Sequence, residues 1–200
     1  MISSIRGTHD ILPGEVEKWQ YVEHVARSLC ERYGYAELRT PVIEREELFS
    51  KGTGETTDIV QKEMYSFTDK GGDRVTLRPE ATPSMVRAYV EHSLEHALPV
   101  TKVYSMGPMF RYERPQKGRY RQFHQLDVEV FGMHDPAVDA EVIELAWSLI
   151  DPILEGWQSK HAPSLAFYES STWGPSKADE FIKADGRNWI YGCGVSDGRG

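Results

Sequence analysis

Residues 103–132 constrain the fold more than any other stretch, because a strand pattern runs into a basic loop and then returns. VYSMGPMFRYE predicts the first strand, and QFHQLDVEVFG predicts the strand that comes back beside it. Side chains alternate between the two faces of a strand, so the returning strand has a polar row and a largely apolar row. The polar row is Gln125, Asp127 and Glu129, and the other row is His124, Leu126, Val128 and Val130.

The loop between these strands, RYERPQKGRYR, is strongly cationic within a chain whose formal net charge is −8. Overall acidity argues against a general nucleic-acid binder, but a local cluster of positive charge suits a specific anion. A solvated basic loop without a ligand is the alternative. The cationic residues of the loop are Arg111, Arg114, Lys117, Arg119 and Arg121, against the single acid Glu113.

Arginines and carboxylates held over one surface suit a definite reaction. Arginine binds phosphate oxygens through paired hydrogen bonds and stays charged, so it can stabilise negative charge that develops on a phosphate. Carboxylates opposite can accept hydrogen bonds from an amine or an imidazole N–H. The pattern therefore fits activation of an amino acid by ATP, in which the carboxylate attacks the α-phosphate and pyrophosphate leaves.

Patterns on either side of this hairpin predict an α+β fold, an antiparallel sheet flanked by helices. An amphipathic helix is expected near residues 15–33, ended by Gly34. Another begins at Asp135-Pro136 and is broken or kinked at Pro152. EMYSFTD and RVTLR flank KGGD as a second hairpin.

Two further segments are expected to border and cover the sheet. AELRTPVIE indicates a strand that Pro41 interrupts, which makes it an edge strand or a strand at a partner surface. Thr82 is predicted to cap a helix that has Pro83 at its first position. The buried stripe of that helix would be Val86, Tyr89, Val90 and Leu94.

Composition narrows the setting in which the chain works. No apolar run is long enough to span a membrane, and MISSIRGTHDILPGE lacks the apolar core of a signal peptide. Only Cys30 and Cys193 occur, so no disulfide framework is expected and a reducing cytoplasm is the expected location. His92 and His96 have a metal-ligand spacing, but no third ligand is evident and two adjacent glutamates indicate a plain polar helix face, so no metal site is expected there.

Four segments, in order along the chain, resemble the class II histidyl-tRNA synthetases. The first, IRGTHDILPGE, resembles the family's N-terminal signature, and the second, LRTPVIE, is similar to its motif 1, whose proline lies at the dimer interface. The third, KEMYSFTDKGGDRVTLRPEATPSMVRA, resembles its hairpin and amino-acid-binding TLRPE segment. The fourth, FRYERPQKGRYRQFHQLDVEVFG, is similar to its motif 2. The resemblance covers about residues 2–147, and several independent motifs in the right order make a chance match remote.

This resemblance implies a class II synthetase-like catalytic core over residues 1–147 that binds ATP, normally with Mg²⁺. Arg111 would be the catalytic residue, binding the α-phosphate and the substrate carboxylate. Glu113 would help hold the adenine end, Arg119 would reach the outer phosphates, and Phe123 would stack on adenine.

The same resemblance implies that L-histidine is the amino acid. Glu80, Ala81 and Thr82 would hold its α-amino group with help from Gln125, and Glu129 would accept a hydrogen bond from the imidazole. A buried carboxylate rejects an apolar side chain because it would be left unpaired, which gives histidine specificity a physical basis.

Histidine tRNA is a further implied partner, and so is a second copy of the chain, which would meet the first through Pro41 to form a homodimer. Simpler structural readings exist for several of these residues. Glu80 could be a helix-start carboxylate, Gln125 and Glu129 a solvated strand face, and Pro41 a strand terminator.

Residues 148–200 depart from the family pattern and are expected to be a separate, partly helical tail with a disordered glycine-rich end. We find no counterpart there of the second histidine-specific motif, the glycine-rich strand turn or motif 3, so the sheet is expected to leave an open edge. AWSLIDPILEGWQ and LAFYESSTWGPSKADEFIKADGRNW instead resemble the C-terminal end of bacterial glucose-6-phosphate dehydrogenases. A fusion or rearranged reading frame explains this similarity, and a diverged tail with accidental similarity is the alternative.

The sequence thus predicts an incomplete histidine–tRNA ligase core, with weak or absent aminoacylation by this chain alone and at most residual binding of ATP or histidine. The alternative is a non-catalytic synthetase-like module that regulates histidine metabolism. Such modules typically lose part of the ATP-binding arginine set, whereas Arg111 and Arg119 are present here. An oxidoreductase, suggested only by the tail, lacks a glycine-rich nucleotide-binding motif.

Overall fold

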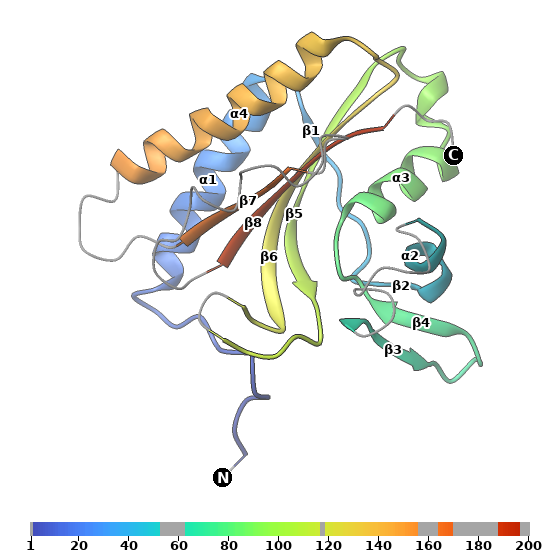
Figure 1. The fold of residues 1–200 in the computed structure, drawn as a ribbon, viewed down its shortest axis with the longest axis vertical. Coiled ribbons are helices and arrows are strands. Elements are labelled where there is room, and N and C mark those ends of the chain that lie inside the picture. The colour runs from blue at the N-terminus through green and yellow to red at the C-terminus, as the bar shows by residue number, and fades with distance from the viewer. Residues whose placement is uncertain (1, 53–62, 117–118, 156–163, 170–187, 197–200) are drawn as a thin grey trace.

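An antiparallel hairpin forms the middle of the larger of two sheets (Figure 1). The structure is a computed structural model that describes residues 2–52, 63–116, 119–155, 164–169 and 188–196. Strands β5 (Thr101–Phe110) and β6 (Gln122–Phe131) pair along their whole length, from Thr101 opposite Phe131 to Phe110 opposite Gln122. The hairpin predicted around the cationic loop is confirmed.

Parallel strands extend this hairpin on both sides, in the order β1-β5-β6-β8-β7. β1 (Ala36–Glu37) pairs with β5, β8 (Asn188–Ser196) pairs with β6, and β7 (Ser164–Glu169) lies beyond β8. The predicted α+β fold, an antiparallel sheet flanked by helices, is confirmed for the central hairpin and its helices, and the parallel strands on both sides make the whole sheet mixed.

The open strand edge expected for an unfinished sheet is not found at β6, because β5 lies on one side of it and β8 on the other. The backbone groups along that edge of β6 need partners, and residues 188–196 supply them. Residues 190–196 of the end expected to be disordered lie in β8, and residues 197–200 lie outside the described residues.

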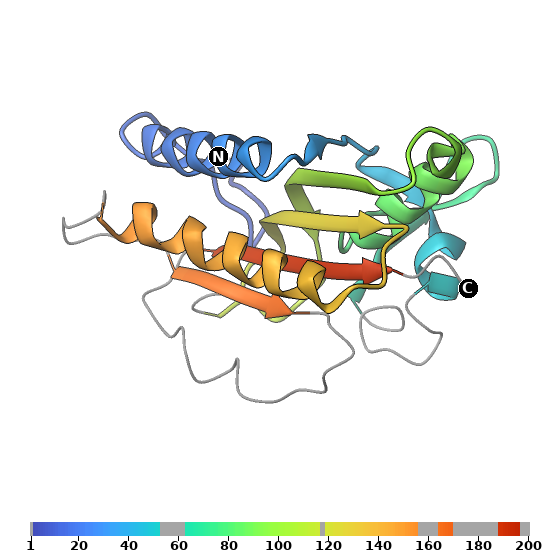
Figure 2. The ribbon, with the colours of Figure 1, turned by 90° about the horizontal axis from the view of Figure 1, so that it is seen from above.

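Helices α1 (Val16–Arg32) and α4 (Pro136–Glu155) cover one face of the sheet and contact each other. Figure 1 shows this pair on one side of β5 and β6, with α2 and α3 on the other, and Figure 2 shows the same division from above. The helix expected near residues 15–33 is confirmed, but Pro152 does not end α4, which continues to Glu155. The apolar row of β6 meets both helices in the larger core, formed by residues that include Val22, Ala26, Leu29, Leu126, Val128, Val130, Val142, Leu145 and Leu149.

A smaller antiparallel sheet, ordered β2-β4-β3, lies on the opposite side of the molecule from α1 and α4 (Figure 1). β3 (Tyr65–Thr68) and β4 (Arg74–Leu77) form the hairpin predicted around KGGD. The AELRTPVIE segment is shared between the sheets, since β1 belongs to the larger one and β2 (Ile43–Arg45) to the smaller. Pro41 is exposed in the connection between them.

Helix α3 (Thr82–Glu91) begins where predicted but differs in detail, and a short 3-10 helix η2 (Leu94–His96) follows it. Ala81 is the capping residue, so the predicted Thr82 cap is wrong, because the Thr82 hydroxyl is bonded elsewhere. Of the predicted stripe, Val86 and Tyr89 pack against the core, Val90 is exposed and Leu94 lies in η2, while the fully buried residues of α3 are Pro83, Ser84, Met85 and Ala88. Helix α2 (Glu46–Gly52) precedes the smaller hairpin. Within the described residues, none of the helices combines the length and apolarity that crossing a membrane requires.

The packing of α4 makes a prediction about stability. Leu145 is buried against the apolar row of β6, so Leu145→Ala should lower the free energy of unfolding by about 2–5 kcal/mol. Ile143 lies on the same helix but is exposed, so Ile143→Ala should cost no more than about 0.5 kcal/mol. Urea denaturation of both variants measures the difference, and equal losses would contradict this placement of α4.

Candidate functional site

The polar row of β6 is buried. Gln125, Asp127 and Glu129 are 4%, 2% and 0% exposed, which excludes the reading of this row as a solvated strand face. The register places them opposite Gly107, Ser105 and Val103 of β5. A row of polar groups that is buried instead of solvated needs hydrogen-bond partners or a ligand.

The segment that leads into α3 covers this row. Ala81 and Met85 pack with Met109, Phe123 and Phe131 in a second apolar cluster on this face of the hairpin. At the first residue of α3, the Thr82 hydroxyl donates a 2.7 Å hydrogen bond to Oε1 of Glu129. The start of α3 is thus fixed directly to the polar row.

Arg111 approaches the same region from the end of β5. Its Nε donates to the carbonyl oxygen of Pro79 at 2.9 Å, and its guanidinium lies 5.1 Å from the centre of the Phe123 ring. Its positive charge lowers the pKa of Glu80 and that of Asp127, against a larger effect of burial. The predicted residues Glu80, Ala81, Thr82, Arg111, Gln125 and Glu129 therefore gather in one place.

Several buried oxygen atoms of this cluster have no hydrogen-bond donor among the described residues. They are Oε1 of Glu80, Oε1 of Gln125, Oδ2 of Asp127 and Oε2 of Glu129. A buried acceptor without a donor loses its hydration and gains nothing in return, which costs about 1–3 kcal/mol per group. These oxygens can accept hydrogen bonds from a molecule that carries N–H or O–H donors.

The carboxyl groups of the site hold protons more tightly than usual. Burial raises the pKa of Glu129 to about 8, against a lowering by the Thr82 hydrogen bond and with a further rise from the charge of Glu80. Burial also raises the pKa of Glu80, and it raises the pKa of Asp127 well above its ordinary value, with the charges of Glu129 and Glu80 adding to the rise. A cationic ligand would favour the ionised forms of all three groups.

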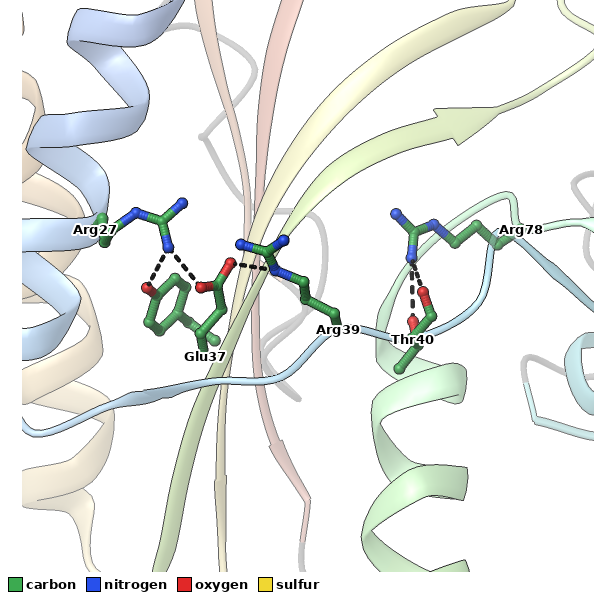
Figure 3. A network of polar contacts seen from close by, with 6 residues as sticks. Arg27, Glu37, Arg39, Thr40 and Arg78 are labelled. Carbon is green, nitrogen blue, oxygen red and sulfur yellow. Dashed lines mark hydrogen bonds and ion pairs between the residues drawn. The ribbon is translucent and has the colours of Figure 1, made fainter.

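Arg78 is a buried cation that the sequence analysis did not single out. Its Nη1 donates to the carbonyl oxygen of Thr40 at 2.9 Å and to Oγ1 of the same residue at 3.1 Å (Figure 3). Its Nε donates to the carbonyl oxygen of Pro108 at 3.0 Å, and a Cβ atom on Gly107 would lie 2.7 Å from its Nη2. Burial lowers the pKa of this guanidinium, and the charges of Asp127 and Glu44 oppose that change.

Arg78 thus links the segment between β1 and β2 to the site, through its hydrogen bonds to Thr40 and its charge interaction with Asp127. At the other end of that connection, Glu37 pairs with both Arg27 and Arg39 (Figure 3). The backbone of residues 37–40, which leads to Pro41, is therefore anchored at both ends.

The remaining residues predicted to bind ATP lie in the cationic loop and at the start of β6. Arg119 is 64% exposed in its side chain, and its Nη1 lies 3.5 Å from Oε2 of Glu113. Phe123 is buried beneath Arg111. Lys117 lies outside the described residues.

Asp127 and Arg78 also belong to the site, although neither is among the binding residues predicted from the sequence. Alternation along β6 places Asp127 between Gln125 and Glu129, so the strand pattern contains the signal for it. No comparable signal exists for Arg78, because its burial depends on the approach of Thr40 and Gly107 from distant parts of the chain.

Comparison with known proteins gives a consistent family assignment. The family model described as histidyl-tRNA synthetase matches residues 7–158. The histidine–tRNA ligase of Desulforamulus reducens is 66% identical over 145 residues, which are 72% of this chain and 34% of that protein. The ligase of Geobacillus kaustophilus is 61% identical over 150 residues, which are 74% of this chain and 35% of that protein. The chain thus spans about a third of the length of these curated relatives.

Solved structures agree with the fold. The apo histidyl-tRNA synthetase of S. aureus aligns with a TM-score of 0.65 at 38% identity, covering 84% of this chain and 37% of that one. A protein from Bacillus halodurans named as an ATP phosphoribosyltransferase regulatory subunit/histidyl-tRNA synthetase aligns with a TM-score of 0.64 over 76% of this chain and 38% of its own. At 24% identity, that second likeness shows the fold alone. From the match over residues 7–158 and these relatives, we conclude that the chain belongs to the histidyl-tRNA synthetase family.

Proposed function

We propose that this chain carries the L-histidine and ATP site of a histidine–tRNA ligase core and that it works in the cytoplasm. The observation that carries the proposal is the state of Glu129. This carboxyl is fully buried, one of its oxygens accepts from Thr82, and the other has no donor among the described residues. An imidazole N–H is a donor of the kind that this second oxygen needs.

The donors of histidine match the acceptors of the site. The α-ammonium group has three N–H bonds and the imidazole has at least one, and the site offers unpaired oxygens on Glu80, Gln125, Asp127 and Glu129. Thr82 contributes as well, because its O–H is committed to Glu129 and its oxygen remains available as an acceptor. Phenylalanine has nearly the same shape but would leave Glu129 unpaired, which favours histidine.

Arg111 is the residue proposed to act on the reacting groups. Its guanidinium lies beside Pro79 and Phe123 and close enough to Glu80 and Asp127 to lower the pKa of each. There it can bind the carboxylate of histidine and the α-phosphate of ATP together. The carboxylate oxygen forms a bond to the α-phosphorus while the bond to the leaving pyrophosphate breaks, and the arginine stabilises the charge that develops.

The other ATP contacts follow from the family match. Glu113 is proposed to hold the adenine end, Arg119 the outer phosphates, and Phe123 one face of adenine. Arg119 and Glu113 already pair across the loop, so binding of the phosphates would replace that exposed ion pair. Among the residues that the structure describes, no three acidic, histidine or cysteine side chains are grouped to cage a metal ion. Mg²⁺ is proposed to bind with the phosphates of ATP, because Mg²⁺ is commonly held by substrate phosphates together with one or two carboxylates.

A second copy of the chain and histidine tRNA complete the proposal. Pro41 and Val42 in the connection between the sheets and Ile43 at the start of β2 are all exposed, and this apolar run is where a homodimer would form. The backbone that leads to it is held by Arg78, so the dimer surface is presented on a fixed segment.

The division at residue 147 is also a proposal. Residues 1–147 would form the catalytic core and residues 148–200 a tail of separate origin. Helix α4 crosses this boundary, and much of the dehydrogenase-like segment, residues 170–187, lies outside the described residues.

Ligand binding tests the histidine site. Glu129→Gln replaces the acceptor oxygen by an amide, so it should weaken L-histidine binding about tenfold or more, since a hydrogen bond to a charged group is worth about 1.5–3 kcal/mol. Glu144→Gln, at an exposed position on α4, should change nothing. Titration calorimetry with L-histidine and L-phenylalanine provides the measurement, and equal affinity for the two amino acids would rule out the proposed role of Glu129.

The raised pKa of Glu129 predicts how stability depends on pH. An acid whose pKa rises on folding, here from 4.5 to about 8, stabilises the fold most below its ordinary pKa. That contribution is lost as the pH rises toward 8, and Asp127 acts in the same direction. Between about pH 5 and about pH 8.5 the parent should therefore lose more stability than Glu129→Gln, whereas Glu144→Gln should follow the parent. Urea denaturation over this range would refute the assignment if all three curves ran parallel.

Exchange of labelled pyrophosphate into ATP separates a ligase core from a regulatory module. A ligase core should show slow histidine-dependent exchange that Arg111→Gln reduces to background, while Arg32→Gln on the exposed end of α1 leaves it unchanged. Binding of both ligands without any exchange would instead support the module that regulates histidine metabolism.

A further inference from the structure

An N-terminal strap, residues 5–11, packs against the returning arm of the cationic loop. The backbone N–H of Arg121 donates to the carbonyl oxygen of Gly7 at 2.7 Å. The rings of His9 and Tyr120 lie 4.7 Å apart between their centres, and both His9 and Ile11 line a small hollow with Tyr120. The proposed function gives this segment no role, although it forms two separate contacts with the loop.

Gly7 lies so close to the loop that no side chain fits there. A Cβ atom on Gly7 would be 2.9 Å from Cγ of Arg121 and 3.0 Å from Cγ of Pro115. Its φ of +88° is a left-handed conformation that glycine adopts without strain. The turn that presents it is closed by Thr8, whose N–H and hydroxyl both donate to the carbonyl oxygen of Ile5.

Arg121 also contacts the opposite arm of the loop, the part that includes Arg111 and Glu113. Its carbonyl oxygen accepts from the N–H of Arg111 at 3.0 Å, and its Nε donates to the carbonyl oxygen of Glu113 at 3.3 Å. Its guanidinium lies 4.0 Å from the centre of the Tyr112 ring, a distance at which a cation is attracted to the ring face. Arg121 thus joins the strap to the backbone of Arg111 and Glu113, two of the residues proposed to hold ATP.

We propose that the N-terminal strap is a positioning element for the ATP-binding loop, with Gly7 as its contact and Arg121 as the brace that sets Arg111 and Glu113. The identity of the ligand rests on the proposed function, whereas the contacts themselves do not. The hydrogen bond and the ring contact of the strap are both made with the loop, so ATP binding should weaken more than L-histidine binding, in which Arg111 also takes part.

Two glycine substitutions test this proposal against a matched control. Gly7 and Gly14 have φ values of +88° and +90°, so alanine causes similar backbone strain at both positions. A Cβ atom on Gly14 meets nothing within 4 Å, whereas one on Gly7 meets Arg121 and Pro115. Any difference between Gly7→Ala and Gly14→Ala in the 200-residue chain therefore reports the contact with the loop.

Two readouts are measured on both variants. Hydrogen exchange of the peptide that spans residues 109–123 should be faster in Gly7→Ala, because the amide of Arg121 loses its acceptor. The Kd for ATP in titration calorimetry should rise about tenfold or more in Gly7→Ala, because the groups that position ATP are displaced, and the Kd for L-histidine, which shares only Arg111 with this loop, should rise less. Gly14→Ala should match the parent in both measurements.

A double-mutant cycle with Arg121→Ala checks that the effect passes through Arg121. Arg121→Ala removes Cγ and Cδ, so adding Gly7→Ala to it should weaken ATP binding less than Gly7→Ala does in the parent. Additive effects of the two substitutions would overturn the role of Arg121 as the brace.

The remaining outcomes are distinguishable. Equal hydrogen-exchange rates in Gly7→Ala and Gly14→Ala would contradict the claim that the strap orders the loop. Faster exchange in Gly7→Ala with unchanged ATP affinity would contradict the claim that the strap positions the loop for ATP. A parent chain that binds no ATP would refute the proposed ligand, and the exchange comparison would still decide whether the strap orders the loop.

Discussion

The pairing of β5 with β6 is the constraint on which the rest of the structure depends. Because the two strands stay in register from Thr101 to Phe110, each residue of β6 has a fixed neighbour and a fixed face. One face presents Leu126, Val128 and Val130 to the helices α1 and α4, and the other presents the carboxyl groups. A single hairpin therefore builds the main core and the floor of the site at once.

The floor of the site is costly to fold, and its surroundings limit that cost. Burial opposes the ionisation of Glu80, Asp127 and Glu129, and crowding of like charges adds to the effect. Arg78 and Arg111 bring positive charge to the same region, and Thr82 satisfies one oxygen of Glu129. The acceptors that remain unpaired are a local loss of stability that a ligand with matching donors would recover.

The hairpin, the alternation of polar and apolar residues along β6 and the cationic loop can all be predicted from the sequence, because each depends on residues that are neighbours in the chain. The sequence also places Arg111 next to the strands that hold the carboxyl groups. The burial of Gln125 and Glu129 cannot be predicted in this way, because it depends on α3, a segment distant in the sequence, which packs over them. For the same reason the Thr82 hydroxyl looks like a helix cap in the sequence and is a partner of Glu129 in the structure. The strand β8 is beyond local prediction as well, since its place is set by the free edge of β6.

The register also limits how relatives of this chain can diverge in length. Residues inserted or deleted near the tip of the loop between Phe110 and Gln122 leave both strands in phase. Deleting one residue of β6 before Glu129 would move every later side chain of the strand to the opposite face of the sheet. Glu129 would then lie among the aliphatic side chains of α1 and α4, and an apolar neighbour would take its place in the site. For the pairing of the two strands, gaps and insertions are therefore tolerable at the tip of the loop and destructive within β6.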